Sequence, residues 1–164
     1  NYDQNKLRYE RIIIMTDADV DGAHIASLLM TFFYLEMSQL IENGNLYIAL
    51  PPLYKISSGT KVMYAMDDNQ RDFFLKEHFK DSKKVEINRF KGLGEMPAQQ
   101  LRDTTMDPKK RQLLKVIVPN VLAGANSKEV IETKTFVQNL MGRKPEQRLA
   151  FIQKNAAEVR AMDV

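Results

Sequence analysis

Three aspartates at alternate positions, Asp17, Asp19 and Asp21, are the residues of this chain that most clearly suggest chemistry. In an extended segment alternate side chains share one face, so these carboxylates are expected to converge while Ala18 and Val20 point away. Crowded carboxylates repel one another unless a divalent cation neutralises them, and hard oxygen ligands suit Mg²⁺ or Mn²⁺ better than zinc. The spacing therefore predicts a metal site, and such an ion can stabilise an attacking or leaving oxygen in phosphoryl chemistry.

Two other structures are compatible with this aspartate pattern. Asp-x-Asp-x-Asp-Gly also opens an EF-hand calcium loop, but that loop needs a bidentate Glu at its twelfth position, where this chain has Leu28. The second is a turn without a metal, in which Asp21 caps the helix that follows. The spacing alone leaves this capping turn open beside the metal site.

His24 and a basic loop supply the remaining candidate site residues. His24 follows the aspartates into the next helix and is expected to be their hydrogen-bond partner or a core histidine rather than a metal ligand. Arg89 and Lys91 adjoin Gly92 and Gly94, which allow the backbone to approach a ligand closely. These four residues are predicted to contact a phosphate backbone, with an ordinary tight turn as the alternative.

The elements that must position the aspartates form a βαβ unit. The continuous apolar run at 11–15 predicts a buried strand that ends just before Asp17. Helical spacing over 23–41, the stop signal at 43–44 and the apolar run at 46–50 predict a helix and a second strand. This order favours parallel pairing and puts the aspartates at the carboxyl end of a strand, where open α/β sheets bind ligands.

The rest of the chain is predicted to alternate short strands and helices. A hairpin is expected over 53–66, followed by a helix from Asp67 or Asp68 to about Phe79. After these we expect a strand at 85–90, a short helix at 97–102, a strand at 113–118, a linker at 119–127 and helices at 128–141 and 146–159. The fold class is therefore α/β, a Rossmann-like and mainly parallel sheet flanked by helices, with a helical C-terminal tail.

Composition and charge narrow the function classes. The chain has 164 residues, 44% hydrophobic and 27% charged, which fits one domain with a tail and argues against disorder. Without Cys there is no disulfide framework, Cys-based zinc site or cysteine nucleophile, and no apolar run reaches the roughly 18 residues of a membrane span. Residues 1–79 carry 7 basic and 11 acidic groups, whereas 80–115 carry 10 basic and 5 acidic. This division suits a metal enzyme that acts on a polyanion, although two solvated faces would give the same counts.

Several motifs together resemble one family. Residues 13–25 closely resemble the acidic motif of the TOPRIM domain in the B subunits of bacterial type IIA DNA topoisomerases. Residues 51–55 and 89–96 are similar to two further signatures of that family, in the same order, and 104–108 and 140–143 extend the likeness. The family has two branches, the B subunits of topoisomerase IV and of gyrase. The short stretch between Tyr64 and Arg89, and residues 143–148, are more similar to the topoisomerase IV branch of proteobacterial type.

The resemblance implies the Mg²⁺-dependent DNA cleavage and religation part of an ATP-dependent enzyme, which passes one duplex through a break in another. Topoisomerase IV would decatenate and relax DNA, and gyrase would supercoil it. Asp17 and Asp19 match the family's catalytic Mg²⁺ ligands, with Asp21 as a supporting acid. Arg89 and Lys91 match residues near the cleaved backbone of double-stranded DNA. The attacking tyrosine would come from the A subunit, in a heterotetramer of two A and two B subunits in the bacterial cytoplasm, associated with the nucleoid.

The family's ATPase domain, its first TOPRIM strand and its Glu-Gly-Asp-Ser motif are not found in this sequence. Glu10 is the only Glu before Asp17, and an extended chain puts it over about 20 Å away. The expected organisation is a TOPRIM domain at 1–118, with an inserted hairpin and the basic loop, and a helical tail at 119–164. The chain alone is expected to bind Mg²⁺ weakly and to lack ATP turnover and topoisomerase activity. Two alternatives are a receiver-like signalling domain, which also clusters aspartates at strand ends, and a non-catalytic module that docks on DNA and the A subunit.

Overall fold

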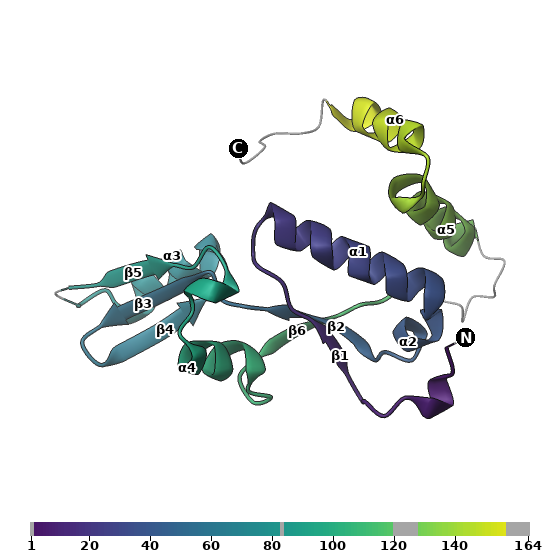
Figure 1. The fold of residues 1–164 in the computed structure, drawn as a ribbon. Coiled ribbons are helices and arrows are strands. Elements are labelled where there is room, and N and C mark those ends of the chain that lie inside the picture. The colour runs from purple at the N-terminus through teal and green to yellow at the C-terminus, as the bar shows by residue number, and fades with distance from the viewer. Residues whose placement is uncertain (1, 83, 120–127, 157–164) are drawn as a thin grey trace.

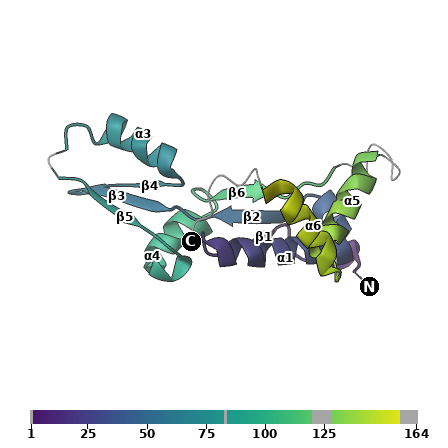
Figure 2. The ribbon, with the colours of Figure 1, turned by 90° about the horizontal axis from the view of Figure 1, so that it is seen from above.

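The computed structural model describes residues 2–82, 84–119 and 128–156. Two small sheets of three strands each lie next to one another, with helices around them (Figure 1). Helix α1, Val20–Glu36, runs along the first sheet, and helix α3, Asp68–His78, lies on the second (Figure 2). The α/β class predicted from the sequence is confirmed. None of the described helices is long and apolar enough to cross a membrane.

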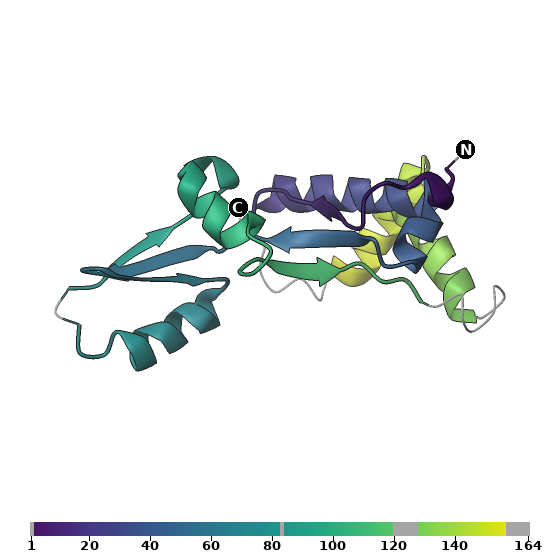
Figure 3. The ribbon, with the colours of Figure 1, turned by 90° about the horizontal axis from the view of Figure 1, so that it is seen from below.

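The first sheet contains the predicted βαβ unit. Its strand order is β1-β2-β6, where β1 is Ile12–Ile14, β2 is Leu46–Leu50 and β6 is Gln112–Lys115. Strands β1 and β2 pair in parallel, as the pattern predicts, and Ile14 lies opposite Ile48, whereas β6 joins β2 antiparallel. Helix α1 runs above these strands in Figure 1, and seen from below the short strand β1 lies in front of the helix (Figure 3), so α1 covers one face of the sheet.

The core of this unit forms between α1 and the sheet. Ile14 on β1, Ala26 on α1 and Leu46 on β2 are all buried, at 5%, 7% and 0% exposure. Full burial of a large aliphatic side chain contributes about 1.5–3 kcal/mol. This core therefore fixes the carboxyl end of β1, from which the aspartates continue.

Helix α1 begins and ends earlier than the sequence predicts. It begins at Val20 rather than Ala23, because Asp19 and not Asp21 is the N-cap residue. It ends at Glu36, where Met37 leaves the helical region with φ −142°, and a separate short helix α2 follows at Ser38–Glu42.

The second sheet is antiparallel throughout. Its order is β4-β3-β5, with β3 at Tyr54–Ser58, β4 at Lys61–Ala65 and β5 at Glu86–Arg89. Gly59 makes the predicted hairpin turn with φ +59°, a backbone conformation that favours glycine. Among the described strands only β1 and β2 pair in parallel, so a mainly parallel sheet is not observed. The hairpin accounts for the β3–β4 pair, because a short hairpin turn can join only antiparallel strands.

Helix α3 covers one face of the second sheet. Of the two residues predicted to cap it, Asp67 or Asp68, Asp67 is the cap and accepts a hydrogen bond from the Gln70 N–H at 2.7 Å. Beneath the helix, Tyr54, Ile56 and Ala65 form a small core with Phe79.

The segment from the second sheet back to β6 contains short helical turns. It holds a 3₁₀ turn at Leu93–Glu95, helix α4 at Ala98–Leu101 and a π-helical turn at Arg102–Met106, and a further 3₁₀ turn lies at Gln4–Lys6. The short helix predicted at 97–102 is confirmed. The π-helical turn extends it and buries Thr104 and Thr105.

The tail contains two helices, α5 at Lys128–Met141 and α6 at Pro145–Asn155. Both were expected, although residues 157–159 of the second prediction and 120–127 of the linker lie outside the described residues. Helix α5 lies beside α1 (Figures 1 and 2), and residues of both line a hollow of about 320 Å³. The division of the chain at residue 118 stays a prediction.

Candidate functional site

The acidic motif and the basic loop meet although they are far apart in sequence. The backbone N–H of Leu93 donates to Asp17 Oδ1 at 2.7 Å, a contact between residues 76 positions apart. Gly92 lies against the same carboxylate, because a Cβ atom at that position would be only 2.9 Å from Asp17 Cγ. Gly92 therefore makes a close approach to Asp17, and the expected approach of the loop to a phosphate stays a prediction.

The contact is supported by packing beneath the loop. Phe90 and Met96, at the two ends of the loop, are 8% and 6% exposed. Both border a void of only about 10 Å³ together with Ala18 and the Pro51-Pro52 pair that ends β2. A void of this volume leaves room for about one water molecule at most. The loop is thus seated on the carboxyl edge of the first sheet.

Asp19 is held by the helix that it caps. Its Oδ1 accepts a hydrogen bond from the Gly22 N–H at 2.7 Å. Gly22 passes so close to the preceding turn that a Cβ there would lie 2.1 Å from the backbone oxygen of Asp17. Only glycine fits this approach, and it brings the start of α1 down onto the acidic segment.

The three aspartates do not form the single carboxylate face that their spacing predicts. Convergence requires an extended chain through Asp21, whereas the helix begins at Val20 and takes Asp21 into its first turn. Within residues 2–82, 84–119 and 128–156, no group of three acidic or histidine side chains is placed to hold a metal ion. The capping turn is also present, with Asp19 in the role expected of Asp21.

The basic residues of the loop are exposed. Arg89 is the last residue of β5, opposite Tyr54 in the register, and Lys91 lies two positions further on. The Phe90 N–H between them donates to the Leu53 carbonyl at 2.8 Å. Neither cation forms an ion pair within the part of the chain that the structure describes, so both are available to an external anion. A Cβ atom added at Gly94 would meet no atom within 4 Å, so this glycine lies at the open side of the loop.

His24 does not take either expected role in this structure. It is exposed on α1, so it is not a core histidine. Over the described residues no hydrogen bond or ion pair joins it to Asp17, Asp19 or Asp21.

A polar network supports the strand that carries Arg89. The Tyr54 hydroxyl donates to Asp68 Oδ1 at 2.7 Å, Arg71 pairs with Asp68, and the Arg71 guanidinium lies 4.9 Å from the centre of the Tyr54 ring. The hydrogen bond to Asp68, together with burial, raises the pKa of Tyr54. The same hydrogen bond lowers the pKa of Asp68, and Arg71 and Arg89 add to that effect.

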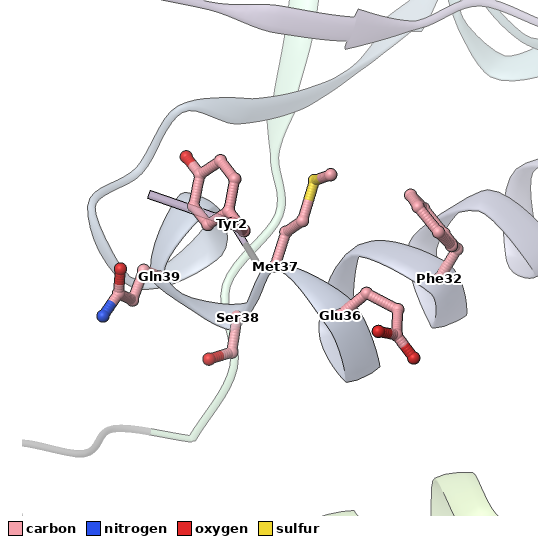
Figure 4. Close-up of a pocket in the computed structure, with 6 residues that line it drawn as sticks. All are labelled: Tyr2, Phe32, Glu36, Met37, Ser38 and Gln39. Carbon is pink, nitrogen blue, oxygen red and sulfur yellow. The ribbon is translucent and has the colours of Figure 1, made fainter. Parts of the chain in front are cut away.

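A wide hollow elsewhere is a weaker candidate for chemistry. It measures about 670 Å³ and is lined by Tyr2, Phe32, Glu36, Met37, Ser38 and Gln39 (Figure 4). It lies at the C-terminal end of α1, about 25 Å along the helix from the acidic motif. In Figure 4 the polar ends of Tyr2 and Glu36 point in different directions, so they do not converge on one ligand.

The donor chemistry of Asp17 and Asp19 fits a magnesium ion. Both are exposed carboxylates, and each uses Oδ1 to accept a backbone N–H. In the described residues neither Oδ2 atom has a hydrogen-bond partner. Mg²⁺ is commonly held by one or two carboxylates together with water and substrate phosphates rather than by a cage of protein ligands. Two carboxylates therefore fit the ion without completing its coordination.

Two contributors to the site were missed by the sequence reasoning. The first is the Leu93 N–H, which no local pattern can indicate because its partner is 76 positions away. The second is Glu95, whose Oε2 accepts the Lys91 N–H at 2.7 Å and closes the loop. The spacing of Glu95, four residues after Lys91 with Gly92 and Gly94 between them, is the pattern that could have indicated it.

Comparison with known proteins gives two family matches. Residues 1–51 match the Toprim domain, and residues 82–153 match the family described as DNA gyrase B subunit, carboxyl terminus. A Toprim domain in a topoisomerase generally implies the use of a divalent metal. The two matched ranges contain the acidic motif and the basic loop, respectively.

Individual relatives are similar over almost the whole chain. The B subunit of DNA topoisomerase 4 from Bartonella bacilliformis is 57% identical over 163 residues, which is 99% of this chain and 22% of the relative. The protein of the same name from Caulobacter vibrioides is 58% identical over 155 residues, 94% of this chain and 21% of the relative. The B subunit of DNA gyrase from Spiroplasma citri is 49% identical over 164 residues, 100% of this chain and 24% of the relative.

The chain spans about a fifth of the length of these curated relatives. The resemblance expected from the motifs is confirmed, including the order of the two branches, since both topoisomerase 4 relatives are more similar than the gyrase relative. The chain belongs to the family of bacterial type IIA DNA topoisomerase B subunits.

Proposed function

We propose that this chain is the metal-dependent DNA cleavage and religation part of the B subunit of topoisomerase IV. The complete enzyme would use ATP to decatenate and relax double-stranded DNA. The observation that carries this proposal is the hydrogen bond from the Leu93 N–H to Asp17, which joins the acidic motif to the basic loop. Carboxylates that hold a cation and exposed cations that hold phosphates are needed together where a phosphodiester is cut.

Asp17 and Asp19 would hold Mg²⁺, or Mn²⁺ in its place, with Asp21 as a supporting acid in the first turn of α1. When bound, the ion supplies stabilisation of negative charge on the oxygens of the phosphodiester. The chain's own part is to orient the two carboxylates, through the N–H groups of Leu93 and Gly22. His24, which follows the aspartates into α1, would be a hydrogen-bond partner of these carboxylates once DNA is bound.

DNA would lie along the exposed basic loop. Arg89 and Lys91 would contact backbone phosphates, and Gly92 and Gly94 would let the loop approach them. The partner would be the A subunit, which supplies the nucleophilic tyrosine in a complex of two A and two B subunits. ATP would bind outside this chain, and the complex would act on the nucleoid in the bacterial cytoplasm.

The test uses the substitution Asp19→Asn in the complete B subunit, in complex with the A subunit. Asn is also a good N-cap, so the start of α1 is kept while the charge is removed. We expect Mg²⁺-dependent decatenation to be lost and ATP hydrolysis to be retained. Undiminished decatenation by Asp19→Asn would withdraw the assignment of Asp19 to the metal site.

Assays of the same reconstituted enzyme distinguish two alternative functions. The match to the gyrase B carboxyl terminus and the 49% identity to a gyrase relative favour gyrase as the second candidate. A gyrase would introduce negative supercoils into relaxed circles, whereas topoisomerase IV would not. A non-catalytic docking module is favoured by the lack, among the described residues, of a group of three acidic or histidine side chains placed to hold a metal ion. Such a module would bind DNA and the A subunit without any metal-dependent cleavage.

A further inference from the structure

The loop after β5 is shaped by one exposed side chain. Glu95 Oε2 accepts the Lys91 N–H at 2.7 Å, so its carboxylate reaches back over the loop. The turn is completed by two weaker backbone hydrogen bonds, from Glu95 N–H to the Gly92 carbonyl and from Met96 N–H to the Leu93 carbonyl, both 3.2 Å long. Because Glu95 itself is exposed, its contribution to the loop is this hydrogen bond and not burial.

The same loop makes one polar contact with the acidic motif. Its Leu93 N–H points at Asp17 Oδ1, at 2.7 Å, and Gly92 borders the carboxylate from the side. Phe90 and Met96 are buried and fix where the loop begins and ends. Between these two anchors, the Glu95 contact to the Lys91 N–H spans the stretch of backbone that carries the Leu93 N–H.

We propose that Glu95 is a positioning residue for the Asp17 carboxylate. It acts through the Leu93 N–H, holding the loop in the one shape that fixes the orientation of Asp17. This inference rests on the proposed function, in which Asp17 holds the divalent cation. Partners that orient a metal-binding carboxylate commonly change metal affinity when they are removed.

Two other roles for Glu95 lead to different outcomes. A residue that merely stabilises the fold would leave metal affinity unchanged in the folded variant. A residue that contacts the cation directly would need its negative charge. The Gln side chain keeps the acceptor oxygen for Lys91 N–H and removes the charge, so Glu95→Gln separates positioning from direct contact.

The experiment measures Mn²⁺ binding calorimetrically, without ATP, in the complete B subunit when it is in complex with DNA and the A subunit. The variants are Glu95→Ala, Glu95→Gln and Asp17→Ala, with Glu77→Ala as the matched control, because Glu77 is an exposed residue of α3. Amide hydrogen exchange of the loop at 91–96 is followed in the same samples and reports the loop shape independently of activity.

We expect Glu95→Ala to weaken Mn²⁺ binding about three- to tenfold. Loss of a direct hydrogen-bond partner of a metal ligand commonly lowers metal affinity about 10- to 100-fold, and Glu95 acts on Asp17 only indirectly. Exchange in the loop should become faster, and Glu95→Gln should restore both quantities to within about twofold of the wild type. Glu77→Ala should change neither.

The contrary outcomes are distinct. Wild-type Mn²⁺ affinity in Glu95→Ala, with affinity lost in Asp17→Ala, would overturn the role of Glu95 and leave the proposed function standing. A Glu95→Gln variant as weak as Glu95→Ala would also overturn it, since the charge would then be what matters. Wild-type affinity in Asp17→Ala would instead remove Asp17 from the metal site, and the proposed function with it.

Discussion

Asp19 Oδ1 accepts the Gly22 N–H at 2.7 Å, so the carboxylate that is proposed to hold a metal also begins helix α1. The capping turn and the metal site are therefore compatible, because the cap uses one oxygen of Asp19 and leaves Oδ2 without a hydrogen bond among the described residues. A substitution at this position changes helix stability and metal binding together unless the replacement keeps the cap.

Asp19→Ala and Asp19→Asn are predicted to differ in stability but not in activity. Ala removes the cap and should lower the free energy of unfolding by about 1 kcal/mol, whereas Asn retains an acceptor and should cost a few tenths at most. Both remove the carboxylate, so both should abolish decatenation. Scanning calorimetry of the complete protein measures the first effect, and equal melting temperatures for the two variants would contradict a capping role for Asp19.

Gly92→Ala is predicted to impair the site more than Gly94→Ala. A Cβ at position 92 would meet Asp17 Cγ at 2.9 Å, which forces the loop or the carboxylate to move, whereas a Cβ at 94 meets nothing within 4 Å. We expect Gly92→Ala to lower the decatenation rate at limiting Mg²⁺ about tenfold, since displaced site residues commonly cost that much or more. Titration of Mg²⁺ for both variants is the measurement, and an equal loss in the two would show that steric contact with Asp17 is not the cause.

Much of the fold follows from local patterns in the sequence. The bounds of α5 depend on neighbouring residues, and the sequence predicts them; it also predicts the cap of α3 to within one residue, as Asp67 or Asp68. The start of α1 depends on how closely Gly22 can approach the backbone of Asp17, which is a tertiary contact, and there the prediction of Asp21 as the cap was wrong. Likewise, the antiparallel direction of β6 is set by the path of the chain through the second sheet, which no local pattern encodes.

The candidate site, like the fold, could be predicted from the sequence only in part. The residue types and spacing of Asp17 and Asp19 predict a metal-binding role, and in the structure each carboxylate accepts a backbone N–H through Oδ1. The convergence of Asp21 with them was not observed, because an alternating pattern predicts one face only while the chain stays extended. The neighbour of Asp17 is a backbone N–H, and such a group has no sequence signature.

The Tyr54–Asp68 hydrogen bond is predicted to make stability depend on pH at both extremes. The pKa of Asp68 is lowered, so its contribution is complete above about pH 4 and is lost as the pH falls further. The pKa of Tyr54 is raised, so its contribution is complete below about pH 10 and is lost as the pH rises further. Tyr54→Phe should therefore lower the melting temperature at pH 7, and the difference from the wild type should shrink beyond either limit.

Asp68→Asn is the companion variant for this pair. It keeps an acceptor for the Tyr54 hydroxyl but cannot ionise, so the loss of stability on the acid side should become smaller. Melting temperatures measured from about pH 3 to about pH 11, which brackets the ordinary pKa values of both groups, provide the comparison. A constant difference between Tyr54→Phe and the wild type over that whole range would show that the hydrogen bond is not linked to ionisation.

Arg148 is predicted to hold the two tail helices at their junction. Its Nη1 donates to the Gly142 carbonyl at 2.6 Å and to the Leu140 carbonyl at 3.3 Å, so a cation satisfies carbonyl groups at the end of α5. Arg148→Met keeps the apolar stem and removes the donors. Amide exchange in α6 should become about fivefold faster, equivalent to about 1 kcal/mol for a partly exposed charged hydrogen bond. Arg143→Met is the control, since Arg143 makes no hydrogen bond within the described residues, and equal exchange in both variants would assign the junction to the Phe136–Phe151 ring contact instead.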